Sequence, residues 1–370
     1  MKIKVLFYID TLIGGGAEKV LRNLVNSMDY NKFEITVQTT FKEDVSEYFN
    51  EQINYRYCYK SKNSISRLIF RAEAAAGLVY PLHIKDDYDI EVAYLEAAST
   101  KIMSGSTNKK AKKLAWVHCD LRKITDNPEA YAQKAKAWYE KFDKVICVSE
   151  NVRQGFKELF GNTPESVVVY NTIDDKEVME KAEENLPEDI TKNKLTLVMV
   201  GRLMAQKNYP RLLKTAKKLL EEGFNFDLWI LGEGEKRNTL EEYISQNSLS
   251  NNVKLLGFRN NPYPFIKNAD LLVCSSNYEG FSTFVTEGLI LGKTVVTTNC
   301  SGMDELLGEN EFGIITENND ESFIEGLRKI LSNPPLLDEY TKKAQTRGKQ
   351  FSKEMLTAQT ENIFYNTLGI

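Results

Sequence analysis

The sequence contains few of the residues from which metal centres and disulfide scaffolds are built. Of its 370 residues, only two are histidine and five are cysteine. The cysteines are an odd number, none stands in a Cys-x-x-Cys or Cys-x-x-x-Cys pair, and most lie inside or beside apolar runs. This pattern is typical of buried free thiols in a reducing compartment and argues against disulfides or a cysteine zinc site. No other cluster of acidic residues and histidine has convincing metal-ligand spacing, so we expect no resident metal.

Long apolar runs are absent as well. No stretch approaches the roughly 18 consecutive apolar residues that a membrane-spanning helix needs. The apolar run near the start of the chain ends at Asp10, which makes it too short for the core of a secretory signal. We therefore expect a cytoplasmic protein, and attachment to the inner face of the cell membrane stays open.

The sequence also lacks an excess of charge of one sign. It has 48 basic and 52 acidic residues, for a net charge of −4. Such a balance offers no global basic field, which speaks against a nucleic-acid partner. The hydrophobic content of 42% and the length are those of an ordinary globular protein of two or three domains.

Short β-branched apolar runs alternate with longer segments of helical periodicity along the whole chain. Several runs are apolar at almost every position, which is typical of parallel strands covered by helices on both faces. The runs are too numerous for one sheet, so we predict an α/β protein with two doubly wound, Rossmann-like domains. The predicted strands are residues 3–9, 33–39, 53–59, 90–95, 114–118, 145–149, 167–170, 195–201, 227–231, 253–257, 271–275, 294–298 and 313–316.

A charged segment marks the boundary between these domains. Eight of the eleven residues from Asp174 to Glu184 are acidic or basic, and no strand pattern recurs before Leu195. We predict a first domain over residues 1–172, a linker over 173–194 and a second domain over 195–351. Residues 352–370 are predicted to form an amphipathic helix.

The glycines Gly14, Gly15 and Gly16 follow the first predicted strand and open a helix. Without a Cβ the backbone can approach a ligand closely, and a helix N-terminus favours an anion. The pattern is not Gly-x-Gly-x-x-Gly, and no acidic residue ends the second strand, so a nicotinamide dinucleotide is not expected. A flexible strand-to-helix turn is an equally good interpretation.

Two cations, Arg202 and Lys207, follow the first strand of the second domain. The carboxyl ends of parallel strands are where α/β proteins bind ligands. There the Arg202 fork and the Lys207 point charge could grip a diphosphate. A pair of solvated surface charges is the alternative.

Two glutamates frame the next candidate segment, Glu279 in a loop and Glu287 in the following helix. Gly280 frees the backbone, so the amides of residues 281–283 can face an anion at the helix start. Carboxylates suit hydroxyl-rich ligands, since they accept hydrogen bonds from sugar O–H groups. The alternative makes Glu279 a charge favoured by the helix dipole and Glu287 a solvated helix residue.

Three further signals are weaker. His118 ends a predicted strand, where a catalytic role and a purely structural one are equally supported. Asp87-Tyr88-Asp89 has the form of the DxD metal motif but precedes a strand, and we interpret it as a solvated strand entry. Tyr263 and Lys267 have the Tyr-x-x-x-Lys spacing of nucleotide-sugar epimerases and dehydrogenases. There is no Gly-x-Gly-x-x-Gly loop for them to serve, and Pro264 disfavours a continuous helix.

In their order and spacing these motifs resemble those of glycosyltransferase family 4, retaining enzymes of the GT-B fold in which two Rossmann-like domains face a cleft. Glu279 and Glu287 form an E-x7-E pair with Gly-Phe-Ser directly after the first glutamate. Gly201-Arg202, Lys207-Asn208 and Gly232-Glu233-Gly234 stand upstream, and the resemblance covers nearly the whole chain.

The resemblance implies a nucleotide-sugar donor, above all a UDP-sugar, on the second domain and an acceptor mainly on the first. It also implies that the C-terminal helix returns to the first domain. No cofactor or metal is expected, because two cations can neutralise the leaving diphosphate. The implied catalytic residues are Arg202, Lys207, Glu279 and His118, and the implied donor-binding residues are Gly15, Gly16, Phe258, Arg259, Gly280, Phe281, Ser282, Thr283 and Glu287.

The expected reaction is transfer of a hexose or N-acetylhexosamine to a saccharide acceptor, free or lipid-linked, in the synthesis of a cell-surface polysaccharide such as a capsule. Basic and apolar residues are mixed in residues 61–85, a pattern that an amphipathic helix could explain. Lysines cluster in residues 109–113. Both segments could meet anionic lipid, and two solvated basic faces are the alternative. A non-catalytic partner or carbohydrate-binding subunit of the same fold is the alternative function. The filled positions Arg202, Lys207 and Glu279 favour the enzyme.

Overall fold

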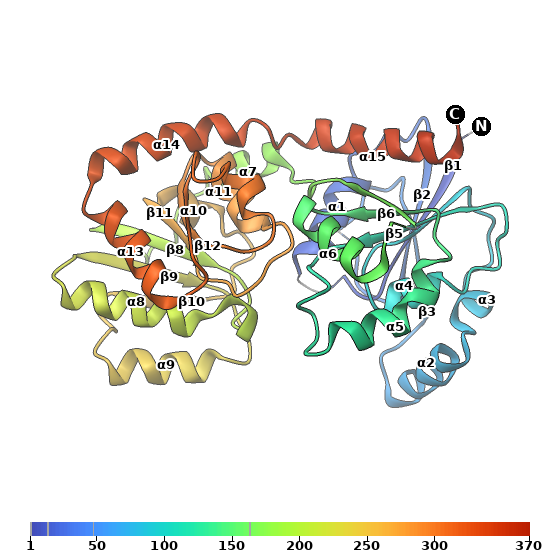
Figure 1. The fold of residues 1–370 in the computed structure, drawn as a ribbon, viewed down its shortest axis with the longest axis horizontal. Helices are drawn as coiled ribbons and strands as arrows, with labels where there is room; N and C mark the ends of the chain where they lie inside the picture. The colour runs from blue at the N-terminus through green and yellow to red at the C-terminus, as the bar shows by residue number, and fades with distance from the viewer. Residues whose placement is uncertain (1, 13–14, 47, 163) are drawn as a thin grey trace. The chain divides into compact units, whose positions relative to one another are not determined.

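The computed structural model describes residues 2–12, 15–46, 48–162 and 164–370, and the chain divides into two compact units (Figure 1). The first unit is Met1–Thr172 together with Lys353–Ile370, and the second is Ile173–Ser352. Each unit contains one parallel sheet whose strands alternate with helices along the chain. This confirms the predicted α/β class with two doubly wound sheets.

The sheet of the first unit has the strand order β3-β2-β1-β4-β5-β6-β7. The side chains from Val5 to Ile9 in its central strand are all buried, as expected of a strand covered on both faces. Its strands are β1 (Ile3–Ile9), β2 (Phe33–Phe41), β3 (Asn54–Tyr59), β4 (Ile90–Ala93), β5 (Lys112–Val117), β6 (Lys144–Cys147) and β7 (Glu165–Val168). Its helices are α1 (Gly16–Val25), α2 (Ser64–Ala76), α3 (Val79–His83), α4 (Ala98–Met103), α5 (Pro128–Tyr139), α6 (Glu150–Phe160) and α15 (Lys353–Leu368).

The sheet of the second unit has the order β10-β9-β8-β11-β12-β13. Strand β9 is buried at every position and pairs in parallel with β8 along its whole length. The strands of this sheet are β8 (Leu195–Val200), β9 (Phe226–Leu231), β10 (Val253–Gly257), β11 (Leu271–Cys274), β12 (Thr294–Thr298) and β13 (Ile314–Thr316). Its helices are α7 (Asp175–Lys181), α8 (Tyr209–Glu221), α9 (Arg237–Gln246), α10 (Tyr263–Asn268), α11 (Thr283–Ile290), α12 (Met303–Leu307), α13 (Asp320–Leu331) and α14 (Pro334–Gly348), with a short 3-10 turn, η1 (Ala205–Lys207).

The last helix, α15, packs on the first unit (red in Figure 1). The buried ring of Phe364 lies 6.1 Å from the ring of Phe7 and 6.2 Å from that of Phe33, centroid to centroid. The backbone N–H of Asp29 donates to Oε1 of Glu361 at 2.8 Å. The core of the first unit is therefore completed by the end of the chain.

The segment predicted to be a linker, residues 173–194, contains a helix. It forms α7, which begins where Asp174 accepts a hydrogen bond from the N–H of Glu177 at 3.0 Å, and it belongs to the second unit. Val178, Ala182 and Ile190 are buried among its charged neighbours, and these apolar residues anchor the segment.

Two other features bear on the sequence predictions. All five cysteines are free, and Cys147, Cys274 and Cys300 are buried. Within the described ranges, no helix combines the length and the apolar character that crossing a membrane requires.

Candidate functional site

The strand order of the second sheet reverses at β8. From this strand the chain first builds outward through β9 to β10, and later from β11 to β13 on the other side. Ligands of doubly wound sheets bind beyond the carboxyl ends of the strands at such a switch point. The loop after β8 carries Arg202 and Lys207, and the loop after β11 carries Glu279. The fold thus brings these three predicted residues to one place.

Lys207 and Glu279 form a buried ion pair at this point. The Lys207 Nζ lies 2.6 Å from Oε1 of Glu279, and the side chains are 17% and 8% exposed. The hydroxyl of Ser276 donates to the same carboxylate oxygen at 2.6 Å. Burial has the largest single effect and lowers the pKa of the Lys207 ammonium, but the attraction of Glu279 and Cys274 and the hydrogen bond with Glu279 together outweigh burial, and the pKa is raised. Lys207 is therefore a cation at physiological pH.

Arg202 differs from Lys207 in its surroundings. It is exposed, and its guanidinium makes no ion pair or hydrogen bond with the residues that the structure describes. Its charge acts on Lys207 and opposes the rise in the pKa of that lysine. A second positive charge thus stands beside the ion pair and is open to a ligand.

Close backbone packing sets the position of the Arg202 loop. Gly232 has a φ of +140°, and a Cβ there would collide with the carbonyl oxygen of Gly201. A Cβ on Gly234 would lie 2.5 Å from the carbonyl oxygen of Leu203, whose N–H donates to the carbonyl of Glu233 at 2.9 Å. The Gly-x-Gly sequence after β9 therefore lets two loops touch through their backbones.

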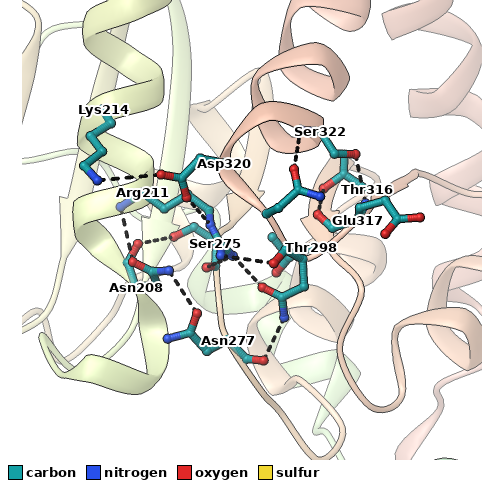
Figure 2. Close-up of polar contacts among 12 residues, drawn as sticks. Asn208, Arg211, Lys214, Ser275, Asn277, Thr298, Thr316, Glu317, Asp320 and Ser322 are labelled. Atoms are coloured by element: carbon teal, nitrogen blue, oxygen red, sulfur yellow. Dashed lines mark hydrogen bonds and ion pairs between the residues drawn. The ribbon is translucent and has the colours of Figure 1, made fainter.

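Amide side chains join the loop after β8 to the loop after β11, a feature that the sequence did not reveal. The N–H of Asn277 donates to the carbonyl of Gln206 at 2.8 Å, and the Gln206 side chain donates to the carbonyl of Tyr278 at 3.0 Å. The Asn208 and Asn277 side chains are hydrogen bonded at 2.9 Å (Figure 2). Asn208 adopts a left-handed φ of 46° and also caps α8. Polar residues directly after two neighbouring strands were the only signal for this network.

Glu287 is buried inside the second unit. The hydroxyl of Tyr263 lies 3.3 Å from its Oε1. The interpretation of Glu287 as a solvated helix residue is therefore wrong. Tyr263 begins α10, so the expectation that Pro264 disfavours a helix here is wrong as well, since proline is compatible with a first turn.

The turn from Gly280 to Thr283 leads into α11. Ser282 caps this helix by accepting from the N–H of Val285 at 3.4 Å. The ring of Phe281 is buried, so only its backbone can serve a ligand. Thr283 is the first helical residue. A Cβ on Gly302 would lie 2.6 Å from the carbonyl oxygen of Gly280, so this glycine gives the turn its space.

Phe258 and Arg259 follow β10. Phe258 is 69% exposed. The Arg259 Nε donates to the carbonyl of Leu256 at 3.1 Å, and the guanidinium lies 5.7 Å from the centroid of the Phe265 ring. The Arg259 side chain is thus held by contacts within the second unit.

His118 lies in the first unit, just after β5. Its backbone N–H donates to Oε2 of Glu96 at 3.0 Å, and its ring centroid lies 4.8 Å from that of Tyr94. Burial lowers the pKa of the imidazole to about 3, opposed only by a hydrogen bond with the Tyr94 backbone. Within the described part of the chain, Nε2 has no hydrogen-bond partner. His118 is therefore neutral at physiological pH and can offer a hydrogen bond but no charge.

The glycine loop lies at the switch point of the first sheet, between β1 and β4. Gly14 is outside the described residues. Gly15 precedes α1 in an extended conformation, and Gly16 is the first helical residue. A Cβ on Gly15 would collide with the Glu18 carboxylate. This carboxylate already occupies the positive end of the helix dipole. At the end of β1, burial raises the pKa of Asp10 to about 6, with the Ser99 hydroxyl donating to its Oδ1 at 3.0 Å.

The Asp87-Tyr88-Asp89 segment lies directly before β4. Asp89 accepts from the N–H of Lys4 at 2.8 Å at the start of β4, as its interpretation as a strand entry predicts. Among the residues that the structure describes, no three histidine, cysteine or acidic side chains gather in a group that could hold a metal ion.

Comparisons with known proteins agree with the sequence motifs. The model described as Glycosyltransferase Family 4 matches residues 14–177, and the model described as Glycosyl transferases group 1 matches residues 180–347. A Campylobacter jejuni relative is named N-acetylgalactosamine-N,N'-diacetylbacillosaminyl-diphospho-undecaprenol 4-alpha-N-acetylgalactosaminyltransferase. It is 30% identical over 363 residues, covering 95% of this chain and 96% of that protein.

Two further comparisons extend this finding. The Escherichia coli UDP-Gal:alpha-D-GlcNAc-diphosphoundecaprenol alpha-1,3-galactosyltransferase is 26% identical over 341 residues, or 87% of this chain and 86% of that one. The crystal structure of Anabaena Alr3699/HepE in complex with UDP-glucose shares the fold with a TM-score of 0.77 and 18% identity. That match covers 98% of this chain and all of the other. The two family models take in nearly all of both units, and the Campylobacter relative matches almost end to end, so this chain belongs to the glycosyltransferases of family 4 and is a transferase of the GT-B fold.

Proposed function

We propose that this glycosyltransferase moves a hexose or N-acetylhexosamine from a UDP-sugar to a saccharide acceptor, with retention of configuration, in the synthesis of a cell-surface polysaccharide such as a capsule. The names of the Campylobacter and E. coli relatives describe transfer to sugars on diphospho-undecaprenol, and the second name gives UDP-Gal as donor. Both names specify an α linkage. An α-linked product is the outcome of retention when the donor sugar is α-linked to its nucleotide.

The observation that carries this proposal is the grouping of Arg202, Lys207 and Glu279 at the switch point of the second sheet. A lysine ammonium has three N–H donors, and the pair with Glu279 uses one of them. The others, with Arg202, would bind the donor diphosphate. Both cations would stabilise the negative charge that grows on the diphosphate as the glycosidic bond breaks. In this proposal the reaction uses neither a metal nor another cofactor.

The remaining residues of the second unit would hold the other parts of the donor. Glu279 would accept hydrogen bonds from hydroxyls of the transferred sugar, and Glu287 from the ribose. The backbone amides at Phe281, Ser282 and Thr283, made accessible by Gly280, would donate to the sugar or the phosphate. The backbone at Phe258 and Arg259 would face the nucleobase.

The first unit would supply His118, Gly15 and Gly16. Because His118 is neutral, it would contribute a hydrogen bond to the transferred sugar. The Glu18 carboxylate at the start of α1 disfavours a second anion there. The resemblance allows either the donor diphosphate or the acceptor at the two glycines, and we therefore propose a hydroxyl-bearing acceptor there.

We further propose that the acceptor is lipid-linked and that α2 meets the inner face of the membrane. This helix has no buried residue and rests on the unit through the ring of Phe70, which packs on aromatic rings at the ends of β2 and β3. Its outer face carries Ile65, Leu68 and Ile69, which are 70%, 68% and 45% exposed. An apolar stripe that points away from its own core is a surface for an apolar partner.

The charged residues of α2 indicate an anionic partner. Arg67 and Arg71 are exposed on the same helix, next to the apolar stripe. Apolar residues flanked by arginine suit an anionic bilayer surface, where the side chains enter the interface and the cations meet the headgroups. The helix is shorter than the basic segment 61–85 had suggested, because it ends at Gly77 with a left-handed φ of 72°.

Thermal shift with single nucleotide-sugars tests the donor site. UDP-sugars are expected to raise the melting temperature of the wild type and of Lys214→Met, a matched exposed lysine on α8. They should not raise that of Lys207→Met, each protein being compared with its own ligand-free form. Release of UDP upon transfer to a saccharide then reports turnover. No shift with any UDP- or GDP-sugar, or an equal shift in Lys207→Met, would contradict the donor site, and a shift with GDP-sugars alone would correct the nucleotide.

Vesicle flotation tests the membrane surface. The wild type should float with vesicles that contain phosphatidylglycerol and not with pure phosphatidylcholine. Replacing Ile65, Leu68 and Ile69 by serine should abolish flotation, while serine at Met179 and Met355, exposed apolar residues elsewhere, should not. Equal flotation of the α2 variant and the control would contradict the proposal.

A further inference from the structure

We propose that Arg211 is a positioning residue of the donor site, which holds the loop after β8 and the loop after β11 in the arrangement that joins Lys207 to Glu279. The inference rests on the proposed donor site and goes beyond it, because Arg211 makes no hydrogen bond to either side chain. It acts through the backbone and amide groups of the two loops.

Arg211 lies in the first turn of α8 and is only 7% exposed, a rare state for arginine. Its guanidinium reaches two segments that are distant in the sequence, residues 318–320 and Ser275 (Figure 2). Nε donates to Oδ1 of Asp320 at 3.0 Å, Nη1 donates to Oδ1 of Asn318 at 2.6 Å and to the Ser275 carbonyl at 3.3 Å, and Nη2 donates to the Asn318 carbonyl at 3.3 Å. Only the planar fork of an arginine can serve these partners at once.

The contacts with Ser275 and Asn318 lead to the loop after β11, whereas the contact with Asp320 joins α8 to α13. Ser275 is the first residue after β11, so the bond to its carbonyl fixes the base of the Glu279 loop. The Asn318 side chain, oriented by Arg211, donates to the carbonyl of Asn277 at 2.8 Å in that same loop. On the other side, the backbone N–H of residue 211, which a substitution would keep, donates to Oδ1 of Asn208 at 3.3 Å, directly after Lys207.

The Ser275 hydroxyl closes this arrangement. It donates to the carbonyl of Lys207 at 2.9 Å and to that of Asn208 at 3.1 Å. The same residue therefore contacts Arg211 through its carbonyl and the Lys207 loop through its hydroxyl. Loss of the guanidinium removes donors from Ser275 and Asn318 and frees both loops to shift relative to one another. Small displacements of groups that act on a reacting centre cost rate steeply.

Arg328 offers a matched control on the same pair of helices. Arg211 bridges the start of α8 to Asp320 at the start of α13. Arg328, in the last turn of α13, binds the carboxylate of Glu222 at the end of α8 at 2.8 and 2.7 Å. Both arginines tie α8 to α13, but among the described contacts only Arg211 also holds the loops. A purely structural role predicts similar consequences for the two substitutions.

The experiment compares full-length wild type, Arg211→Met, Arg328→Met and Lys207→Met, using UDP-sugar transfer well below each melting temperature. We expect kcat of folded Arg211→Met to fall about tenfold or more, with the donor KM changed by less than about threefold. Arg328→Met should keep a kcat within about twofold of wild type. Wild-type kcat in Arg211→Met, or equal losses in the two arginine variants, would overturn the inference.

Two further variants keep the result decisive. If Arg211→Met does not fold, Asn318→Ala cuts the same link from the other side and should show the same loss of kcat. Wild-type kcat in Asn318→Ala would then overturn the inference. Wild-type kcat in Lys207→Met would instead overturn the proposed donor site, so the two failures are distinguishable.

Discussion

Arg202→Ala should reduce activity alone, whereas Lys207→Ala should reduce both activity and stability. Arg202 is exposed and makes no ion pair with the residues described, so its removal should change the free energy of unfolding by less than about 0.5 kcal/mol. Its proposed role is to stabilise the leaving diphosphate, so turnover should fall by about 100- to 1,000-fold, or about 2.7 to 4 kcal/mol in the barrier. Nearly all of its effect should therefore appear in the rate.

Lys207→Ala should reduce both quantities. The substitution leaves the Glu279 carboxylate buried without its cation, with the Ser276 hydroxyl still donating to it at 2.6 Å. Breaking a buried pair by removing one partner costs about 3 kcal/mol, and the partial exposure of Lys207 keeps the cost at this lower end. The double variant Lys207→Ala/Glu279→Ala should lose about 2 kcal/mol less than the sum of the single variants, because neither charge is then left alone.

Urea unfolding followed by circular dichroism measures the stabilities, and steady-state release of UDP measures turnover. If Lys207→Ala were as stable as Arg202→Ala, the ion pair would contribute nothing to folding. If Arg202→Ala kept wild-type turnover, the exposed cation would have no place in the reaction.

Four further predictions concern metal, pH and the contact of His118 with the sugar. Transfer should persist in EDTA; complete loss that magnesium or manganese restores would contradict the role given to the two cations. Asp10→Asn should raise the free energy of unfolding by about 2 kcal/mol above pH 6 and by little at pH 4, as measured by urea titration. The reason is that the folded pKa of Asp10, about 6, lies above the ordinary 3.8, so the stability of the wild type falls as pH rises through this window. An equal gain in the free energy of unfolding at both pH values would refute this explanation. His118, with a folded pKa of about 3 against an ordinary 6.5, should make the wild type lose stability relative to His118→Asn as pH falls from 6.5 to 3, because the unfolded chain takes up the proton first. His118→Ala should also weaken transfer more than UDP binding, and equal losses would remove it from the sugar.

The strands and the ends of the strands were within reach of sequence reasoning. Runs such as residues 3–9 and 227–231 are apolar on both faces, and this pattern depends only on the burial of a parallel strand. Because ligands gather at carboxyl ends, the same pattern pointed to Arg202, Lys207 and Glu279. The structure joins the latter two directly.

The sequence did not predict the hydrogen-bond network of amide side chains or the buried residues Arg211 and Val178. Asn277 and Asn318 contact one another across 41 residues of sequence, and such a pairing leaves no periodic trace. Arg211 has the appearance of a solvated charge in an amphipathic helix, although it is buried. In residues 173–194 the many charges concealed Val178, which is buried. Each of these features depends on a residue whose environment is set by distant parts of the chain.

The return of α15 to the first unit has a consequence for how the protein is made on the ribosome. Residues 1–172 emerge first, yet the rings of Phe7 and Phe33 receive their covering residue, Phe364, only when the last turns have been synthesised. Until then the nascent unit exposes apolar surface to water, the state in which aggregation and chaperone binding occur. The whole second unit must be translated during this interval. The unit whose synthesis begins first is thus completed last.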